Sequence, residues 1–99
     1  MAKKIGKKVA VLIRDKERQY EGLRSSLGLL LENHIVSMFV LDHKIEISED
    51  YIDNMQFIDQ MGGFRFSNVP ENVEKHGFIP VTFEEVALKL RENEVIIPF

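Results

Sequence analysis

The sequence predicts one α/β domain, residues 1–99, folded as a flavodoxin-like three-layer sandwich with a mainly parallel five-stranded sheet and about four helices. Three observations predict this class. Short apolar runs rich in β-branched residues alternate with longer segments whose apolar residues recur at helical spacing. A strand, a helix and a strand in this order imply a right-handed parallel crossover. The chain of 99 residues is long enough for one hydrophobic core and too short for a second domain.

The first half of the chain supplies two predicted strands and the helix between them. Residues 8–14 read KVAVLIR and residues 35–41 read IVSMFVL, and runs that are apolar in this way are typical of strands covered on both faces. Between them, residues 17–34 place leucines along one helical stripe. Gly22 and Gly28 each weaken this helix by roughly 1 kcal/mol relative to alanine, and we interpret them as points where the helix approaches the sheet closely.

The second half repeats this alternation with shorter elements. Ser48 is a suitable N-cap for a helix, which the glycine pair at 62–63 ends. Residues 82–85, TFEE, form a capping box, so the last helix begins there. The other predicted elements are a strand at 64–67, a helix at 70–76 that ends at Gly77, a short strand at 78–81 and a final strand at 95–97.

Composition excludes several classes of function. The chain contains no cysteine, so a thiolate nucleophile, a disulfide and a cysteine-ligated metal are excluded. Its formal charge of −3 has the wrong sign for a nucleic-acid partner. No apolar run approaches the roughly 20 residues that cross a bilayer, and no hydrophobic signal region opens the sequence. We therefore expect a cytoplasmic protein without membrane or nucleic-acid partners, in which the lysine-rich residues 1–7 form a flexible basic leader.

Polar residues follow the first three predicted strands, where ligands bind in open parallel sheets. The candidates for ligand binding are Arg14, Asp15, Lys44, Ser67 and Asn68. Arg14 and Lys44 could be the charge partners of a small anion. The alternative is that these residues belong to solvated loops. No glycine-rich phosphate loop follows any strand, so no nucleotide cofactor is expected.

An aspartate and a histidine, Asp42 and His43, follow one another at the end of the second predicted strand. A carboxylate can orient an imidazole and raise its basicity, so this pair is the candidate acid/base of an enzyme acting on an anionic substrate. The alternative is an exposed loop histidine, since adjacent residues at a strand end usually point apart. The three histidines of the chain lack metal-ligand spacing, so no metal site is predicted.

Aromatic and methionine residues gather in the middle of the chain in larger number than one helix face can bury. Met61, Phe64 and Phe66 are therefore candidates for a subunit interface. The alternative is that they fill the core.

The segments KVAVLIR, IVSMFVL and MGGFRFSN, the helix predicted between the first two, and the ending FIPVTFEEVALKLRENEVIIPF give the chain a family resemblance over nearly its whole length. It resembles the DsrE/DsrF-like family of small sulfur-relay proteins. The resemblance implies homo-oligomers or hetero-oligomers with related subunits, and a persulfide on a cysteine in the loop after a middle strand. In this chain that loop falls near Ser67 and Asn68, which cannot hold a transferable sulfane sulfur. We therefore expect a divergent, non-catalytic binding or oligomeric subunit, either accessory to sulfur relay or binding a small anion.

Overall fold

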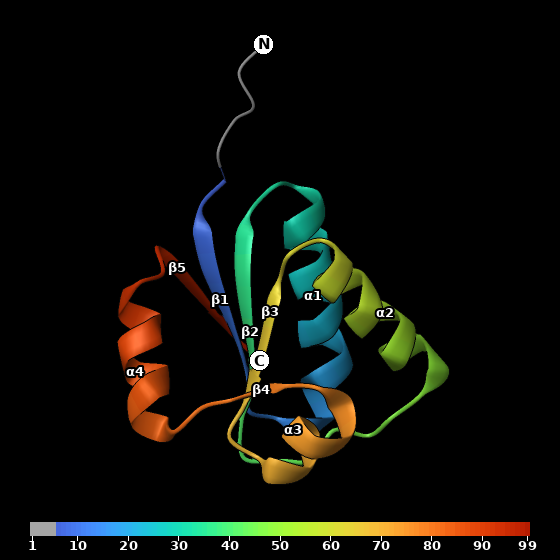
Figure 1. The fold of residues 1–99 in the computed structure, drawn as a ribbon. Coiled ribbons are helices and arrows are strands. Elements are labelled where there is room, and N and C mark those ends of the chain that lie inside the picture. Colours follow the sequence, from blue (N-terminus) through green and yellow to red (C-terminus); the bar gives the residue numbers. More distant parts are fainter. Residues whose placement is uncertain (1–5) are drawn as a thin grey trace.

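The computed structural model describes residues 6–99, and this part of the chain forms a parallel sheet of five strands with helices on both faces (Figure 1). The strand order is β4-β3-β2-β1-β5, and all neighbouring strands are parallel. The strands are β1 (Lys8–Ile13), β2 (Ile35–Val40), β3 (Phe64–Ser67), β4 (Ile79–Pro80) and β5 (Val95–Pro98). The predicted α/β three-layer class is confirmed.

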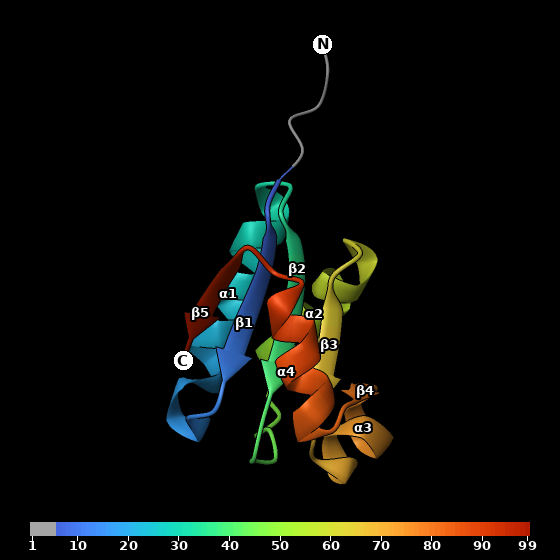
Figure 2. The ribbon, with the colours of Figure 1, turned by 90° about the vertical axis from the view of Figure 1, so that its left-hand side faces the viewer.

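The helices divide unequally between the two faces of the sheet. In the described residues, α1 (Gln19–Leu31), α2 (Glu49–Gln60) and α3 (Pro70–His76) cover one face, and α4 (Phe83–Arg91) lies by itself on the other (Figures 1 and 2). The steps from β1 through β4 all run in one direction across the sheet, so their right-handed crossovers lie on one side. The chain then returns past β1 to β5, which places α4 on the opposite side.

Strand residues alternate between two hydrophobic clusters, which explains why the central strands are apolar throughout. On β1, Val9 and Val11 belong to the larger cluster with α1 and α2, whereas Ala10 belongs to a smaller cluster with Val86 of α4. Phe66 of β3 lies in the smaller cluster. The two clusters make the sheet a buried middle layer.

Most predicted element boundaries agree with the structure. Ser48 caps α2, the capping box at the start of α4 is formed, and Gly77 ends α3 at a φ of 71°. The helix predicted to reach His34 ends at Leu31, because the chain turns through Asn33, whose φ of 67° is left-handed. The short strand predicted at 78–81 has only two residues in β4.

The predicted basic leader falls mostly on residues 1–5, which lie outside the described residues. Lys7 belongs to the described part and pairs its backbone with the rest of the fold. Its amide donates to Nδ1 of His34 at 3.1 Å, and its carbonyl accepts from the amide of Ile35 at 3.0 Å.

The two glycines of α1 have different surroundings. Gly22 lies directly against Ile13 of β1, and a Cβ at this position would overlap the Ile13 side chain. Gly28 has open space where its Cβ would lie. The interpretation of close approach is therefore correct for Gly22 and wrong for Gly28, because Gly28 lies on the exposed side of α1, whereas Gly22, Ser26 and Leu30 face the core.

We expect Gly22→Ala to lower the free energy of unfolding by about 1–3 kcal/mol, because fully buried Ile13 has no room to move. Gly28→Ala is the matched control and is expected to raise it by about 0.5–1 kcal/mol through better helix propensity. Urea unfolding monitored by circular dichroism measures both. Effects of the same sign at the two glycines would contradict the packing described for α1.

Candidate functional site

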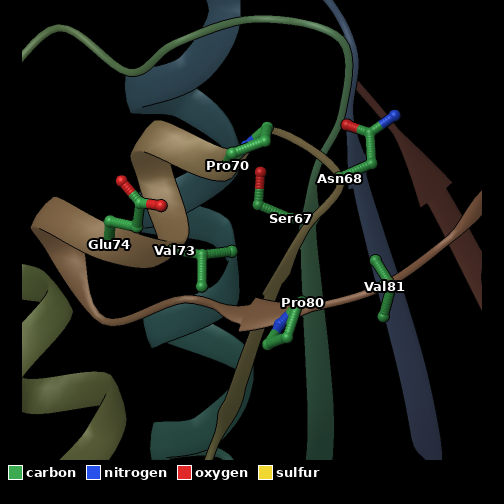
Figure 3. A pocket seen from close by; sticks show the side chains of 7 residues that line it. All are labelled: Ser67, Asn68, Pro70, Val73, Glu74, Pro80 and Val81. Carbon is green, nitrogen blue, oxygen red and sulfur yellow. The ribbon is translucent and has the colours of Figure 1, made fainter.

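The chain reverses its direction across the sheet after β4, and this creates a pocket at the carboxyl ends of β3 and β4. The loop after β3 leads to α3 on one face, and the loop after β4 leads to α4 on the other. Open parallel sheets bind ligands at such a reversal. A pocket of about 190 Å³ lies here; we call it the strand-end pocket (Figure 3). Its lining residues are Ser67, Asn68, Pro70, Val73, Glu74, Pro80 and Val81.

Ser67 ends β3 and is fully buried, at 0% exposed. Its hydroxyl donates to the carbonyl of Val40 at 2.7 Å and accepts from the amide of Val69 and from Nδ2 of Asn72, both at 3.1 Å. The hydroxyl proton and both oxygen lone pairs are therefore in use. Ser67 holds neighbouring segments together and presents no free group to the pocket.

Asn72 of α3 is the residue of this region that the sequence reasoning missed. It is 1% exposed. Its Oδ1 accepts from the amide of Ile45 at 3.1 Å, and its Nδ2 donates to the carbonyl of His43 at 3.0 Å as well as to Ser67. Asn72 thus joins α3 to the loop after β2. No local pattern distinguishes it from a solvated asparagine, because its partners in that loop are distant in sequence.

Asn68 and Asp42 connect the loops after β3 and β2. The amide of Asp42 donates to Oδ1 of Asn68 at 2.8 Å, and Nδ2 of Asn68 donates to Oδ1 of Asp42 at 2.9 Å. The other carboxylate oxygen of Asp42 lies 3.5 Å from Nη2 of Arg14. Arg14, Asp42 and Asn68 therefore meet at the strand ends, as the topology predicts, and the arginine already has an anionic partner.

The other two predicted ligand residues lie apart from this group. Asp15 is the N-cap of a short 3-10 turn at Lys16–Arg18, and its carboxylate accepts a hydrogen bond at 2.9 Å from the amide of Glu17. Lys44 forms an ion pair with Glu71 of α3, with Nζ and Oε1 2.7 Å apart. The five candidates thus do not converge on one anion site, because carboxylates of the chain pair with Arg14 and Lys44.

His43 and Asp42 do not form the predicted catalytic pair. Nδ1 of His43 lies 2.9 Å from the carbonyl oxygen of Leu41, which can only accept, so the proton of the neutral ring is on Nδ1. Nε2 is buried and has no hydrogen-bond partner among the described residues. The Asp42 carboxylate contacts Asn68 and Arg14 instead. The two side chains diverge, as adjacent residues at a strand end usually do.

Glu71 is the surface carboxylate whose titration reports on the pairing of Lys44. The hydrogen bond from Lys44 lowers the pKa of Glu71 below its ordinary value; desolvation opposes this shift, and the charges of Lys44 and Lys75 add to it. A depressed folded-state pKa stabilises the fold above the unfolded-state pKa, and this contribution is lost as pH falls through the lowered value.

We expect an NMR titration of the Glu71 carboxyl group to have its midpoint below that of an unstructured glutamate. In Lys44→Met the midpoint should rise, because the principal hydrogen bond is gone. Lys16→Met is the control, since Lys16 pairs with Glu46 and not with Glu71. An unchanged Glu71 midpoint in Lys44→Met would contradict the ion pair.

The three interface candidates have different positions. Phe64 and Met61 are exposed, but Phe66 is buried and stacks on Phe39 with ring centroids 5.0 Å apart. Phe66 therefore belongs to the core on the α4 side, because its position on β3 points it under α4. The core alternative holds for Phe66, and a subunit interface stays a prediction for Met61 and Phe64.

Fold and site together define the class: an α/β domain with a parallel sheet whose strand-end residues bind mainly one another. Comparison of the chain with protein-family models, curated proteins and solved structures found no match. None of the helices in residues 6–99 has the length and apolar character to span a membrane. The same part of the chain contains no cluster of three residues suited to bind a metal ion.

Proposed function

We propose that this chain is a non-catalytic DsrE-like subunit that acts by binding other protein chains, as an accessory to sulfur relay. The observation that carries this proposal is the state of Ser67. It lies where the resemblance places the reactive cysteine, and its buried hydroxyl is committed to three hydrogen bonds. A residue in this environment supports the loop after β3 and is not available as a nucleophile.

Exposed apolar side chains support a role in binding other chains. Large apolar side chains with high exposed fractions include Phe83 and Leu88 of α4 and Phe64 at the start of β3. Apolar side chains concentrated at one part of a surface are typical of protein–protein contact sites. The strand-end pocket supports small-anion binding less well, since Glu74 lines it and an anion would have to displace a carboxylate from Arg14 or Lys44.

The enzyme alternative lacks the geometry that it needs. A general base must present its basic atom to a substrate. Nε2 of His43 is buried, and Asp42 is occupied by Asn68 and Arg14. We therefore favour the binding subunit over an acid/base enzyme.

A single introduced cysteine tests the role of Ser67, because the chain has no other thiol. In Ser67→Cys we expect slow modification by a thiol reagent or polysulfide, since the side chain is buried. Asn68→Cys, at the more exposed next position, is the matched control and is expected to react fast. Equal rates in folded proteins would mean that the loop opens freely, and this would contradict a purely structural role for Ser67.

Light scattering tests the subunit part of the proposal. The monomer mass is 11.5 kDa, and a multiple of it is expected at high micromolar concentration. A strict monomer, alone and with DsrE-like proteins of the same cell, would contradict this part.

A further inference from the structure

Helix α4 is the only helix on its face of the sheet in the described residues (Figure 2), and apolar side chains on this face are exposed. Phe83 and Leu88 of α4 are 61% and 60% exposed. Ile96 of β5 pairs in register with Ala10, which lies in the cluster under α4, so Ile96 faces the same side and is also exposed. This face of the domain is therefore incompletely covered.

The outward side of α4 carries a short stripe of residues spaced by three and four positions. Val86 and Leu90 face the sheet. Glu84, Ala87, Leu88 and Arg91 are all exposed and lie along the other side of the helix. The stripe thus has an acidic end, an apolar centre and a basic end.

The two charges at the ends of this stripe have no ion-pair partner in the part of the chain that the structure describes. In residues 6–99, neither Glu84 nor Arg91 belongs to an ion pair. The other four arginines of the chain all have a partner: Arg14, Arg18 and Arg65 pair with carboxylates, and Arg24 lies over the ring of Tyr20. Arg91 is the exception in this part of the chain.

We propose that the outward stripe of α4 is a contact surface for a second copy of this chain, with the two α4 helices antiparallel about a twofold axis. The centre of the stripe lies between Ala87 and Leu88. Glu84 and Arg91 are each 3.5 positions from that centre, which is about 5 Å at the helical rise. Antiparallel pairing about this centre therefore places Glu84 opposite the partner's Arg91, and the twofold repeats the contact at the other end.

The same arrangement buries the apolar centre of the stripe. Small Ala87 lets the two helices approach, and Leu88 packs beside the axis. Nine residues of α4 span about 14 Å, too little for the roughly 800 Å² that each partner of a stable complex buries. Phe83 and Ile96, exposed on the same face, extend the contact. This inference rests on the proposed function as a binding subunit and specifies the surface and the partner.

Charge reversal tests the surface. Glu84→Arg and Arg91→Glu each turn two attractive contacts of the dimer into repulsive ones, and each is expected to weaken dimerisation at least about tenfold in analytical ultracentrifugation. The double variant Glu84→Arg/Arg91→Glu restores opposite charges across the axis and is expected to recover most of the affinity. Each substitution also places an unfavourable charge at one end of the α4 dipole. If weaker dimerisation came only from destabilising α4, the double variant would dimerise less well than either single variant.

Leu88→Lys tests the apolar centre and is expected to give a folded monomer. Leu31→Lys is the matched control, because Leu31 is 66% exposed at the end of α1, on the other face of the sheet. It should leave the dimer intact. If the wild type is oligomeric and the α4 variants remain so, the α4 surface is wrong while the subunit function stands. A strictly monomeric wild type overturns the α4 dimer, and a complex with a different DsrE-like protein would then preserve the proposed function.

Discussion

Replacing Arg65 by methionine is expected to lower the free energy of unfolding by about 2–4 kcal/mol. Arg65 is 8% exposed on β3, and its guanidinium donates to both carboxylate oxygens of Asp59 at 2.8 Å and to the carbonyl of His76 at 2.9 Å. The guanidinium also lies 4.7 Å from the ring centre of Phe78. One side chain thus ties β3 to α2 and α3, and methionine fills the space without replacing these bonds.

Arg18→Met is the matched control, since Arg18 pairs with Glu21 at the surface. Exposed pairs of this kind contribute about 0–1 kcal/mol. Urea unfolding should show a lower midpoint with an unchanged slope in Arg65→Met. Similar midpoints for the two variants would show that the buried pair adds no more than a surface pair.

Replacing Asn72 by alanine is also expected to lower the free energy of unfolding by about 2–4 kcal/mol. The change leaves the amide of Ile45, the carbonyl of His43 and the hydroxyl of Ser67 each without one hydrogen bond in a buried place. Calorimetry measures the loss, and faster amide exchange at Ile45 locates it in the loop after β2.

Asn93→Ala is the control for Asn72→Ala. Asn93 makes one side-chain bond, to the carbonyl of Lys89 near the end of α4, so its loss is expected to cost about 1 kcal/mol or less. Amide exchange at Ile45 that stays as slow as in the wild type would contradict the role assigned to Asn72.

The side chains at the strand ends form hydrogen bonds mainly with one another. Ser67, Asn72 and the pair of Asp42 and Asn68 hold the loops after β2 and β3 and helix α3 in one arrangement. Groups committed in this way define the shape of the strand-end pocket and leave few polar atoms free to act on a ligand. Helix α4, by contrast, carries exposed Phe83 and Leu88 together with Glu84 and Arg91, which belong to no ion pair in residues 6–99, and there we propose the contact with a second chain.

Much of the fold could be predicted because its signals are local. The capping box at 82–85, Ser48 and Gly77 act on backbone groups within a few positions, and apolar spacing marks helices and strands residue by residue. Less of the site could be predicted. The rule that strand ends meet brought Arg14 and Asn68 into one network correctly, but it could not show that Asp42 already occupies both.

The sequence by itself determined the order of the elements, the parallel sheet and the absence of a thiol, since these depend on composition and short-range pattern. Only the tertiary structure decided that β5 lies beside β1, that Phe66 is buried under α4, and that His43 turns away from Asp42. The hydrogen bonds that join the loop after β2 to Asn68 and Asn72 link residues 26 to 29 positions apart. Their geometry depends on how separate loops pack, and no local pattern in the chain encodes that packing.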